Sequence, residues 1–301
     1  MITGTRHRLT LEINRQTRLA QDIARAQVEV ATGKRILAPS DDPIGAARVS
    51  GIARAQANEA TWLRNIDTAS ALAARSDTVL NSVALNLERA NELMVAASNG
   101  TLSDANRATI AQELRAIAEE LTALRDSRDP RGEPLFRTNG PLEVPVNEGV
   151  RIAPVAERAA IFEAPVDIIG SINAAVTAIT DPDPATRAPA SQAALIGVGQ
   201  AVAQMANARA DQGIRANRLD AMREGLLNSA VQLEEQRAAI EATNIPEVVA
   251  RMESRRLSLE AAQAIFARLN KSSLFDIIRC GDSGHRSRHP GESRDLRENG
   301  H

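Results

Sequence analysis

The sequence has few aromatic residues: one tryptophan, four phenylalanines and no tyrosine in 301 residues. Aromatic side chains normally fill the centre of a compact enzyme and line its pockets. We therefore expect neither a thick globular core nor an aromatic-lined active site. Alanine is abundant instead, and because it is the best helix former and has a small side chain, it favours long, closely packed helices.

Cysteine is nearly absent, and the single Cys280 lies near the C-terminal end. One cysteine excludes a disulfide framework and a zinc site built from cysteines. No run of 18 apolar residues is present, so we expect no membrane insertion. Residues 1–20 lack the apolar centre of a cleaved secretory signal, so we expect any export to use another route.

The charge balance and the potentially reactive residues argue against nucleic-acid binding and against catalysis. The 36 Lys and Arg residues nearly balance the 38 Asp and Glu residues, giving a net charge of −2, which argues against nucleic acid as a partner. His7 is the only histidine outside residues 280–301, and prolines flank Asp41-Asp42, which favours a helix cap over a catalytic carboxylate pair. With no nucleophile–base pair, ligand cluster or phosphate loop, we expect no enzyme activity, no cofactor and no metal.

Long helices with heptad spacing dominate the rest of the sequence. The predicted helices are 6–32, 43–98, 103–127, 167–180, 190–243 and 246–275. Gly33 is placed to end the first helix, and Asp42 with Pro43 is placed to begin the second. In the second helix the residues at the heptad positions, which form a stripe along one face, are Ile52, Ala55, Glu59, Trp62, Ile66, Ala69, Ala73, Ser76, Leu80, Val83, Leu87, Ala90, Met94 and Ala97. Near Gln212 and Gly213 the stripe of the fifth helix is polar, which predicts a kink or looser packing.

The predicted fold is mainly α, an elongated rod of long antiparallel heptad-patterned helices with a small β-containing insertion. Residues 142–144 and 150–152 alternate in polarity and predict short strands or a hairpin. We expect residues 1–38 to pair with 246–278, residues 39–128 and 166–245 to form a helical rod, 129–165 a small β-rich region, and 279–301 a disordered tail with almost no apolar residues.

The two ends of the chain carry matching, weak heptad stripes, which makes them natural partners for each other. Such thin stripes favour helices that gain order by packing with further helices. The candidate assembly residues are Leu9, Ile13, Ile23, Val30, Val248, Met252, Leu259, Phe266 and Leu269.

Four segments, in order, resemble the bacterial flagellin family. Thr32–Ile36 followed by Pro39–Pro43 is similar to the end of that family's first helix, and Ala97–Asp104 to its turn after the long second helix. Arg128-Asp129 with Leu135-Phe136 resembles the entry to its β region, and Leu257–Phe275 resembles its last helix. The resemblance covers residues 1 to about 278. The chain departs from the family at Arg137-Thr138 and in the segment from Cys280 onward.

The resemblance implies a structural subunit of the bacterial flagellum, located outside the cell and exported unfolded through the flagellar secretion apparatus. The Pro39–Pro43 form and the Ala97–Asp104 run favour the members that join hook to filament over flagellin, the filament subunit. Implied partners are other copies of the chain, other hook-associated proteins, flagellin and an export chaperone. A soluble coiled-coil adaptor or signalling protein is a further alternative, which explains the heptads but not the turn motifs.

Overall fold

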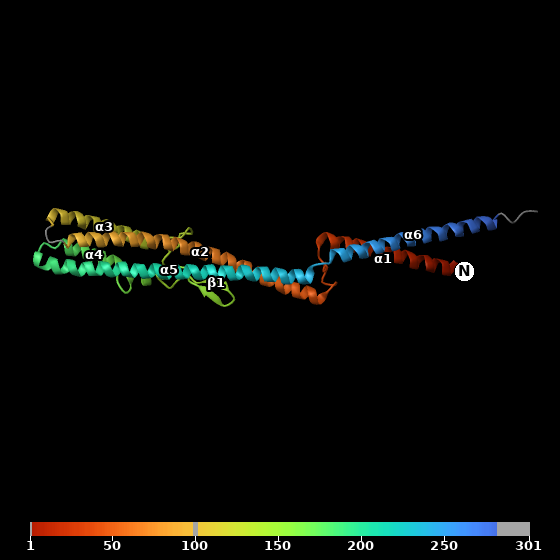
Figure 1. Ribbon diagram of the computed structural model, residues 1–301, viewed down its shortest axis with the longest axis horizontal. Helices are drawn as coiled ribbons and strands as arrows, with labels where there is room; N and C mark the ends of the chain where they lie inside the picture. Colours follow the sequence, from red (N-terminus) through yellow and green to blue (C-terminus); the bar gives the residue numbers. More distant parts are fainter. Residues whose placement is uncertain (1, 99–101, 282–301) are drawn as a thin grey trace, which may run out of the picture. The chain divides into compact units, whose positions relative to one another are not determined.

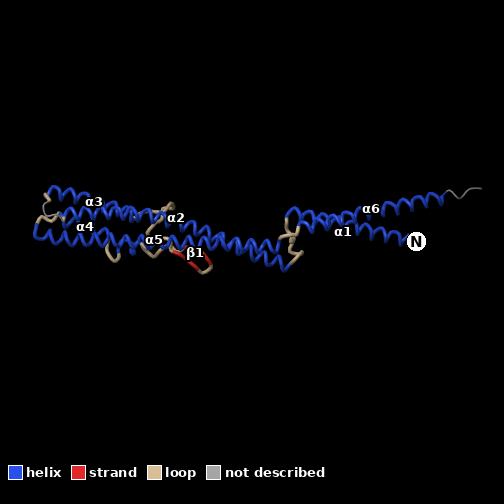
Figure 2. Tube along the Cα trace, viewed as in Figure 1, coloured by secondary structure: helices blue, strands red, loops and turns tan. Residues whose placement is uncertain are grey.

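The computed structural model of the chain describes residues 2–98 and 102–281, and the side chains of residues 7–98 and 102–268. The fold is mainly α with one small two-stranded sheet, as predicted (Figure 2). Its elements are α1 (Ile2–Thr32), α2 (Pro43–Ala97), α3 (Asp104–Arg125), β1 (Val144–Asn147), β2 (Val150–Ile152), the π-helical turn η1 (Ala159–Glu163), α4 (Ile168–Ile179), α5 (Pro184–Glu241) and α6 (Ile245–Gly281). Residues 282–301, most of the predicted disordered tail, lie outside the described residues.

Local signals set most helix ends. Gly33 follows α1 with a φ of +67°, and its N–H donates to the carbonyl of Glu29 at 2.9 Å, which ends the helix as predicted. The Ser103 side chain accepts the N–H of Asn106 at 3.2 Å and begins α3. The Asp167 side chain accepts the N–H of Gly170 at 3.0 Å and begins α4.

The predicted start of the fifth helix is wrong. Helix α5 begins at Pro184 rather than at residue 190, and it includes Pro189. The Asp183 side chain accepts the N–H of Ala185 at 2.9 Å, so Asp183 and Pro184 together form a helix start. Pro189 has no N–H and forfeits one backbone bond, but it is exposed and lies close to the helix start. Helix α5 also continues through Gly213 without a break.

The chain divides into two compact units. The terminal unit comprises Met1–Ala47 with Ala238–His301, and the central unit comprises Arg48–Arg237. In the central unit α2 and α5 run side by side, with α3 and α4 beside them (Figure 1). The heptad stripe predicted for α2 is confirmed over this part of the helix, because each of its residues from Ile66 to Ala97 is buried.

A hairpin covers one part of the central unit. Strands β1 and β2 pair antiparallel, with Val144 opposite Ile152, so the first strand begins at the end of the predicted 142–144 segment. Val146 and Ile152 are buried in a small cluster with Ile66 and residues of α5. Alternate residues of the hairpin therefore point into the core while the intervening ones remain exposed.

One stretch, Ala159–Ile179, is long and apolar enough, by length and composition alone, to cross a membrane. A few polar residues interrupt this stretch, so it contains no unbroken apolar run of 18 residues although its mean hydropathy is high. In the structure the stretch is η1, a turn and α4. Its large side chains, including Phe162, Ile168 and Ile172, are buried in the main core cluster, so packing within the central unit accounts for its apolar character.

Candidate assembly interface

The terminal unit is built on the pairing of α1 with α6, which lie side by side (Figure 1). Ala26 of α1 and Val248 of α6 are its buried apolar residues among those described. Further candidate residues are half-buried along the same contact: Ile23, Val30, Met252, Leu259 and Phe266. The side chain of Leu269 lies outside the described residues. The contact is therefore thin, held by small and partly covered side chains.

The predicted α1 register does not match the helix pair at its N-terminal end. Leu9 is 38% exposed and Ile13 is 49% exposed, so the structure does not bring them into the contact with α6. Leu19, which is half-buried, and Ala26 occupy the contact instead. The shift arises because α1 carries apolar residues on more than one face, and an alanine packs more closely against α6 than a larger residue would.

Many large apolar side chains of the terminal unit are exposed in the single chain. They are Leu9, Leu11, Ile13, Val28, Leu37, Ile44, Ile245, Val249, Leu257 and Ile265. Exposed apolar side chains that cluster on one helix pair are typical of a surface that other protein covers. Leu9 and Ile13 thus belong to the outer surface of the pair rather than to its contact.

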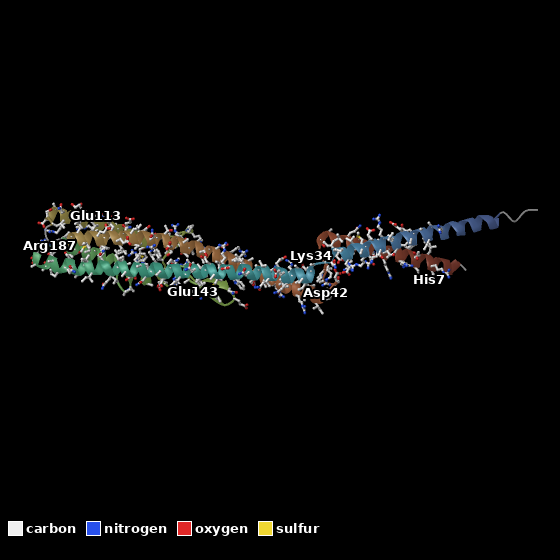
Figure 3. The ribbon with its side chains drawn as sticks, in the orientation of Figure 1. His7, Lys34, Asp42, Glu113, Glu143 and Arg187 are labelled. Carbon is white, nitrogen blue, oxygen red and sulfur yellow. The ribbon has the colours of Figure 1, made fainter. Side chains whose placement is uncertain are left out.

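A clasp formed by residues 33–45 and 240–244 closes the terminal unit at one end of the helix pair. The backbone N–H of Arg35 donates to the carbonyl of Glu241 at 2.7 Å, and the N–H of Thr243 donates to the carbonyl of Gly33 at 3.1 Å. Lys34 forms an ion pair with Glu241 at 2.9 Å. Figure 3 labels Lys34 and Asp42 in this clasp. Backbone pairing between two distant segments makes the clasp a fixed structure rather than a loose connection.

Asp41 organises the turn before α2. Its Oδ2 atom accepts the N–H groups of Leu37 at 3.1 Å and Ala38 at 3.0 Å, and its Oδ1 atom pairs with the guanidinium of Arg25 on α1. The Arg25 hydrogen bond, followed by that of the Ala38 N–H, lowers the pKa of Asp41 below its ordinary value. Asp41 therefore ties the turn to α1 in its charged form.

Asp42 caps α2, as predicted. Its Oδ1 atom accepts the N–H of Gly45 at 2.8 Å, and its Oδ2 atom accepts from Arg35 at 3.2 Å. The Gly45 N–H, and then Arg35, lower the pKa of Asp42. A Cβ atom at position 45 would approach Asp42 Oδ2 to 2.6 Å and Ile36 Cδ1 to 2.7 Å, so a larger residue there would have to displace the ends of these two side chains. Gly45 is not among the residues predicted for the cap, although the Asp-Pro-Ile-Gly spacing places it where a cap donor is needed.

An open polar cleft of about 490 Å³ lies between α1, α6 and the clasp. Most of its charged side chains are paired: Glu29 accepts from Thr243 at 2.5 Å and from Arg251 at 3.4 Å, and Arg255 pairs with Asp22 at 3.6 Å. Among the described residues no group of three or more His, Cys, Asp or Glu side chains is placed to hold a metal ion. The polar side chains of the cleft thus serve to connect α1, α6 and the clasp.

Comparison with protein families matches both ends of the chain. Residues 10–140 match the bacterial flagellin N-terminal helical region, and residues 195–278 match the bacterial flagellin C-terminal helical region. The two matches together take up more than two thirds of the chain, and they contain all of the terminal-unit residues that form the clasp. The family's two ends are therefore both present and in order.

Individual relatives match over shorter stretches. Flagellar hook-associated protein 3 of Salmonella typhimurium is 36% identical over 108 residues, which are 36% of this chain and 34% of that protein. The flagellar filament 41 kDa core protein of Borreliella burgdorferi is 30% identical over 114 residues, covering 36% of this chain and 32% of that protein. The match thus spans about a third of the length of these relatives.

The fold is similar to that of a solved structure. A flagellar hook-associated protein from Vibrio parahaemolyticus superposes with a TM-score of 0.62 at 19% identity, covering 67% of this chain and all of that one. That likeness concerns the fold, and the matches to the N-terminal and C-terminal helical regions carry the assignment. On these grounds the chain belongs to the bacterial flagellin family.

Proposed function

We propose that the chain is a structural subunit of the bacterial flagellum that joins the hook to the filament, and that it has no catalytic role. The observation that carries the proposal is the terminal unit, in which a thinly packed helix pair leaves large apolar side chains exposed. Such a surface costs free energy in water and is stabilised when other helices cover it. The occupant we propose is the terminal helices of neighbouring subunits.

Support for the junction role comes from the likeness to flagellar hook-associated protein 3. A second candidate function is that of flagellin itself, which the weaker likeness to a flagellar filament core protein favours. The two functions predict different amounts of protein, because a junction needs few copies whereas a filament is built from many. Quantifying the chain against total flagellar protein therefore separates them.

The proposed partners follow from the junction role: other copies of the chain, other hook-associated proteins, flagellin and an export chaperone. The proposed location is the flagellum outside the cell, reached through the flagellar secretion channel. A thin helix pair suits this route, because few buried side chains have to be exposed when the terminal unit unfolds.

A deletion of the gene tests the proposal. Cells without the chain are expected to retain hooks, to lack attached filaments and to shed flagellin into the medium, as seen by electron microscopy and immunoblotting. Loss of the filament protein itself would assign the chain as flagellin. Normal attached filaments in the deletion strain would overturn the junction role.

A truncation tests the role of the terminal helices. A chain lacking residues 1–30 is expected to keep a folded central unit, since that unit has its own core, but to fail to attach filaments. A chain cut after Arg279 is the matched control and is expected to attach filaments as the full chain does. Attachment by the chain lacking residues 1–30 would show that α1 is not an assembly element.

A further inference from the structure

The central unit has an acidic groove between α2 and α5. The groove has a volume of about 420 Å³, and small residues open it, among them Ala73, Ala74, Gly213 and Ala216. Asp77 of α2 and Asp220 of α5 stand at its sides. Both aspartates are exposed and form no ion pair within the part of the chain that the structure describes. The sequence expectation of looser packing near Gly213 corresponds to this groove.

Buried acceptors in the groove have no hydrogen-bond partner among the described residues. Gln212 is only 2% exposed, and its Nε2 atom donates to the carbonyls of Ala73 at 3.3 Å and Pro154 at 2.9 Å. Its Oε1 atom is buried and unpartnered, as is the Oγ atom of Ser70. Burying an unsatisfied acceptor costs about 1–3 kcal/mol, so the packing at this level of α2 and α5 is not optimal for the single chain.

A basic pocket of about 320 Å³ lies beside the hairpin and α5. Arg151 of β2 and Arg215 and Arg218 of α5 line it, with Asp211 as its one carboxylate. The Nη1 atom of Arg215 donates to the carbonyl of Ala153 at 3.1 Å, whereas its Nε atom is buried without a partner in the described structure. This pocket therefore offers donors, as the groove offers acceptors.

The two sites lie at the same level of α5 on opposite flanks. Successive residues of an α-helix are rotated by about 100°. Residues 213, 216, 217 and 220 then cluster on one flank, and residues 211, 214, 215 and 218 cluster roughly half a turn away. The groove lies on the first flank and the pocket on the second.

We propose that the exposed arginines at the rim of the basic pocket of one copy face the aspartates at the rim of the acidic groove of the next, so that central units associate side by side. The partner is a second copy of this chain because both complementary surfaces, acceptors on one flank and donors on the other, are present on one molecule. Such a contact is heterologous and repeats from copy to copy, which builds rings or helical arrays. Arg151 and Arg218 would pair with Asp77 and Asp220 of the neighbour, fixing the register of the two units.

The inference rests on the proposed function, because it assumes that copies of the chain assemble in the flagellum. Charge-reversal variants test the contact between copies separately. One full-length variant carries Asp77→Arg and Asp220→Arg, and a second carries Arg151→Glu and Arg218→Glu. Each alone places like charges across the contact, so the number of copies retained on purified flagella is expected to fall by about tenfold or more. Copies are counted by immunoblotting.

The decisive part of the experiment is whether combining the two charge reversals restores retention on flagella. When the two variants are produced together, every contact between unlike variants joins opposite charges, so retention is expected to return. A chain with all four substitutions has a basic groove and an acidic pocket, so two copies of it again present opposite charges to each other. This chain is also expected to be retained. The same pattern of loss and rescue is expected when the purified full-length proteins are sedimented at rising concentration.

Two controls separate pairing from folding and from net charge. Glu119→Arg with Glu120→Arg changes two exposed α3 carboxylates by the same charge, outside the groove, and should leave retention unchanged. Ser70→Ala removes a buried hydroxyl group that is unsatisfied in the single chain and leaves the charges unchanged, so we expect the melting temperature to hold or rise and association to be retained. Circular dichroism of every variant reports its folding.

Retention of both reversed variants at the wild-type amount would overturn the contact. Loss without rescue, in the mixture and in the fourfold variant, would show that the groove and the pocket do not meet. Absence of the wild-type chain from flagella would refute the proposed function instead, and sedimentation would then decide the side-by-side contact.

Discussion

Glu59 of α2 accepts a hydrogen bond from the hydroxyl group of Ser229 on α5, with 2.6 Å between Oε1 and Oγ. Glu59 belongs to the heptad stripe and is buried, and its second oxygen, Oε2, has no partner among the described residues. A carboxylate held by one neutral hydroxyl group is poorly compensated for its lost hydration. At Glu59 and Ser229 the contact between α2 and α5 is therefore less stabilising than a pair of apolar side chains would be.

Replacing this polar pair is expected to stabilise the central unit. Glu59→Leu combined with Ser229→Ala should raise the free energy of unfolding by about 1–3 kcal/mol, because neither partner is left unsatisfied. Thermal unfolding followed by circular dichroism measures the change. Glu88→Leu, at an exposed position of the same helix, is the control and should have little effect. A lower melting temperature in the double variant would show that the pair is stabilising.

The core of the central unit supplies a second prediction, a contrast between two leucines of α2. Leu80 is fully buried, whereas Leu85 is 59% exposed. Leu80→Ala removes buried apolar volume and should cost about 2–5 kcal/mol in urea unfolding. Leu85→Ala should stay within about 0.5 kcal/mol of the wild type. Similar losses in both variants would mean that Leu85 is covered in solution.

The Asp42 cap yields a third prediction. Gly45→Ala should push Asp42 away from its cap position and cost about 0.5–2 kcal/mol, seen as faster hydrogen exchange of the amides at residues 45–47. Gly51→Ala is the matched control, since a Cβ there meets nothing within 4 Å. An alanine at position 51 should slow exchange slightly because alanine favours the helix. Unchanged exchange in Gly45→Ala would show that the Asp42 and Ile36 side chains make room for the added methyl group without loss of the cap.

Acid should loosen the clasp. Because the Arg25 hydrogen bond lowers the folded-state pKa of Asp41, the carboxylate stabilises the folded clasp above its unfolded pKa of about 3.9. That contribution is lost as the pH falls through the lower, folded-state pKa. Exchange protection of the Leu37 and Ala38 amides should therefore drop below about pH 4 in the wild type.

Asp41→Asn is the control for this titration. Its amide oxygen can still accept the N–H groups of Leu37 and Ala38, but it does not titrate, so its protection should not follow the same pH profile. Asp42 is also held charged, by the Gly45 N–H and Arg35, and a residual acid response of the variant would report that residue. Identical profiles in the two proteins would exclude Asp41 as the acid-sensitive group.

The sequence predicts the stripe of α2 well and that of α1 poorly, for one physical reason. In α2 the stripe faces a core rich in Leu, Ile and Val, so burial strongly favours one rotation of the helix. In α1 apolar residues lie on several faces, and among its described side chains, those of residues 7–32, Ala26 alone is buried. A heptad count therefore cannot tell which face of α1 meets α6 and which face remains exposed.

The clasp is predictable only in part. Asp42 with Pro43 is a local cap signal, and the structure confirms it. The pairing of Arg25 with Asp41, and of Thr243 with Glu29, depends on how distant segments meet, and no local spacing encodes that. The start of α5 was missed because three prolines close together indicate a loop, while Asp183 with Pro184 can equally begin a helix.

Trp62 is half-buried against the cluster beneath the hairpin, and Val144 and Val150 of the hairpin pack against the same cluster. Since the chain has no tyrosine and no second tryptophan, its near-ultraviolet emission comes almost wholly from this one indole. A native fluorophore thus sits where the hairpin docks on α2. Its emission wavelength would follow release of the hairpin during unfolding for export, and its return during assembly, with no label attached.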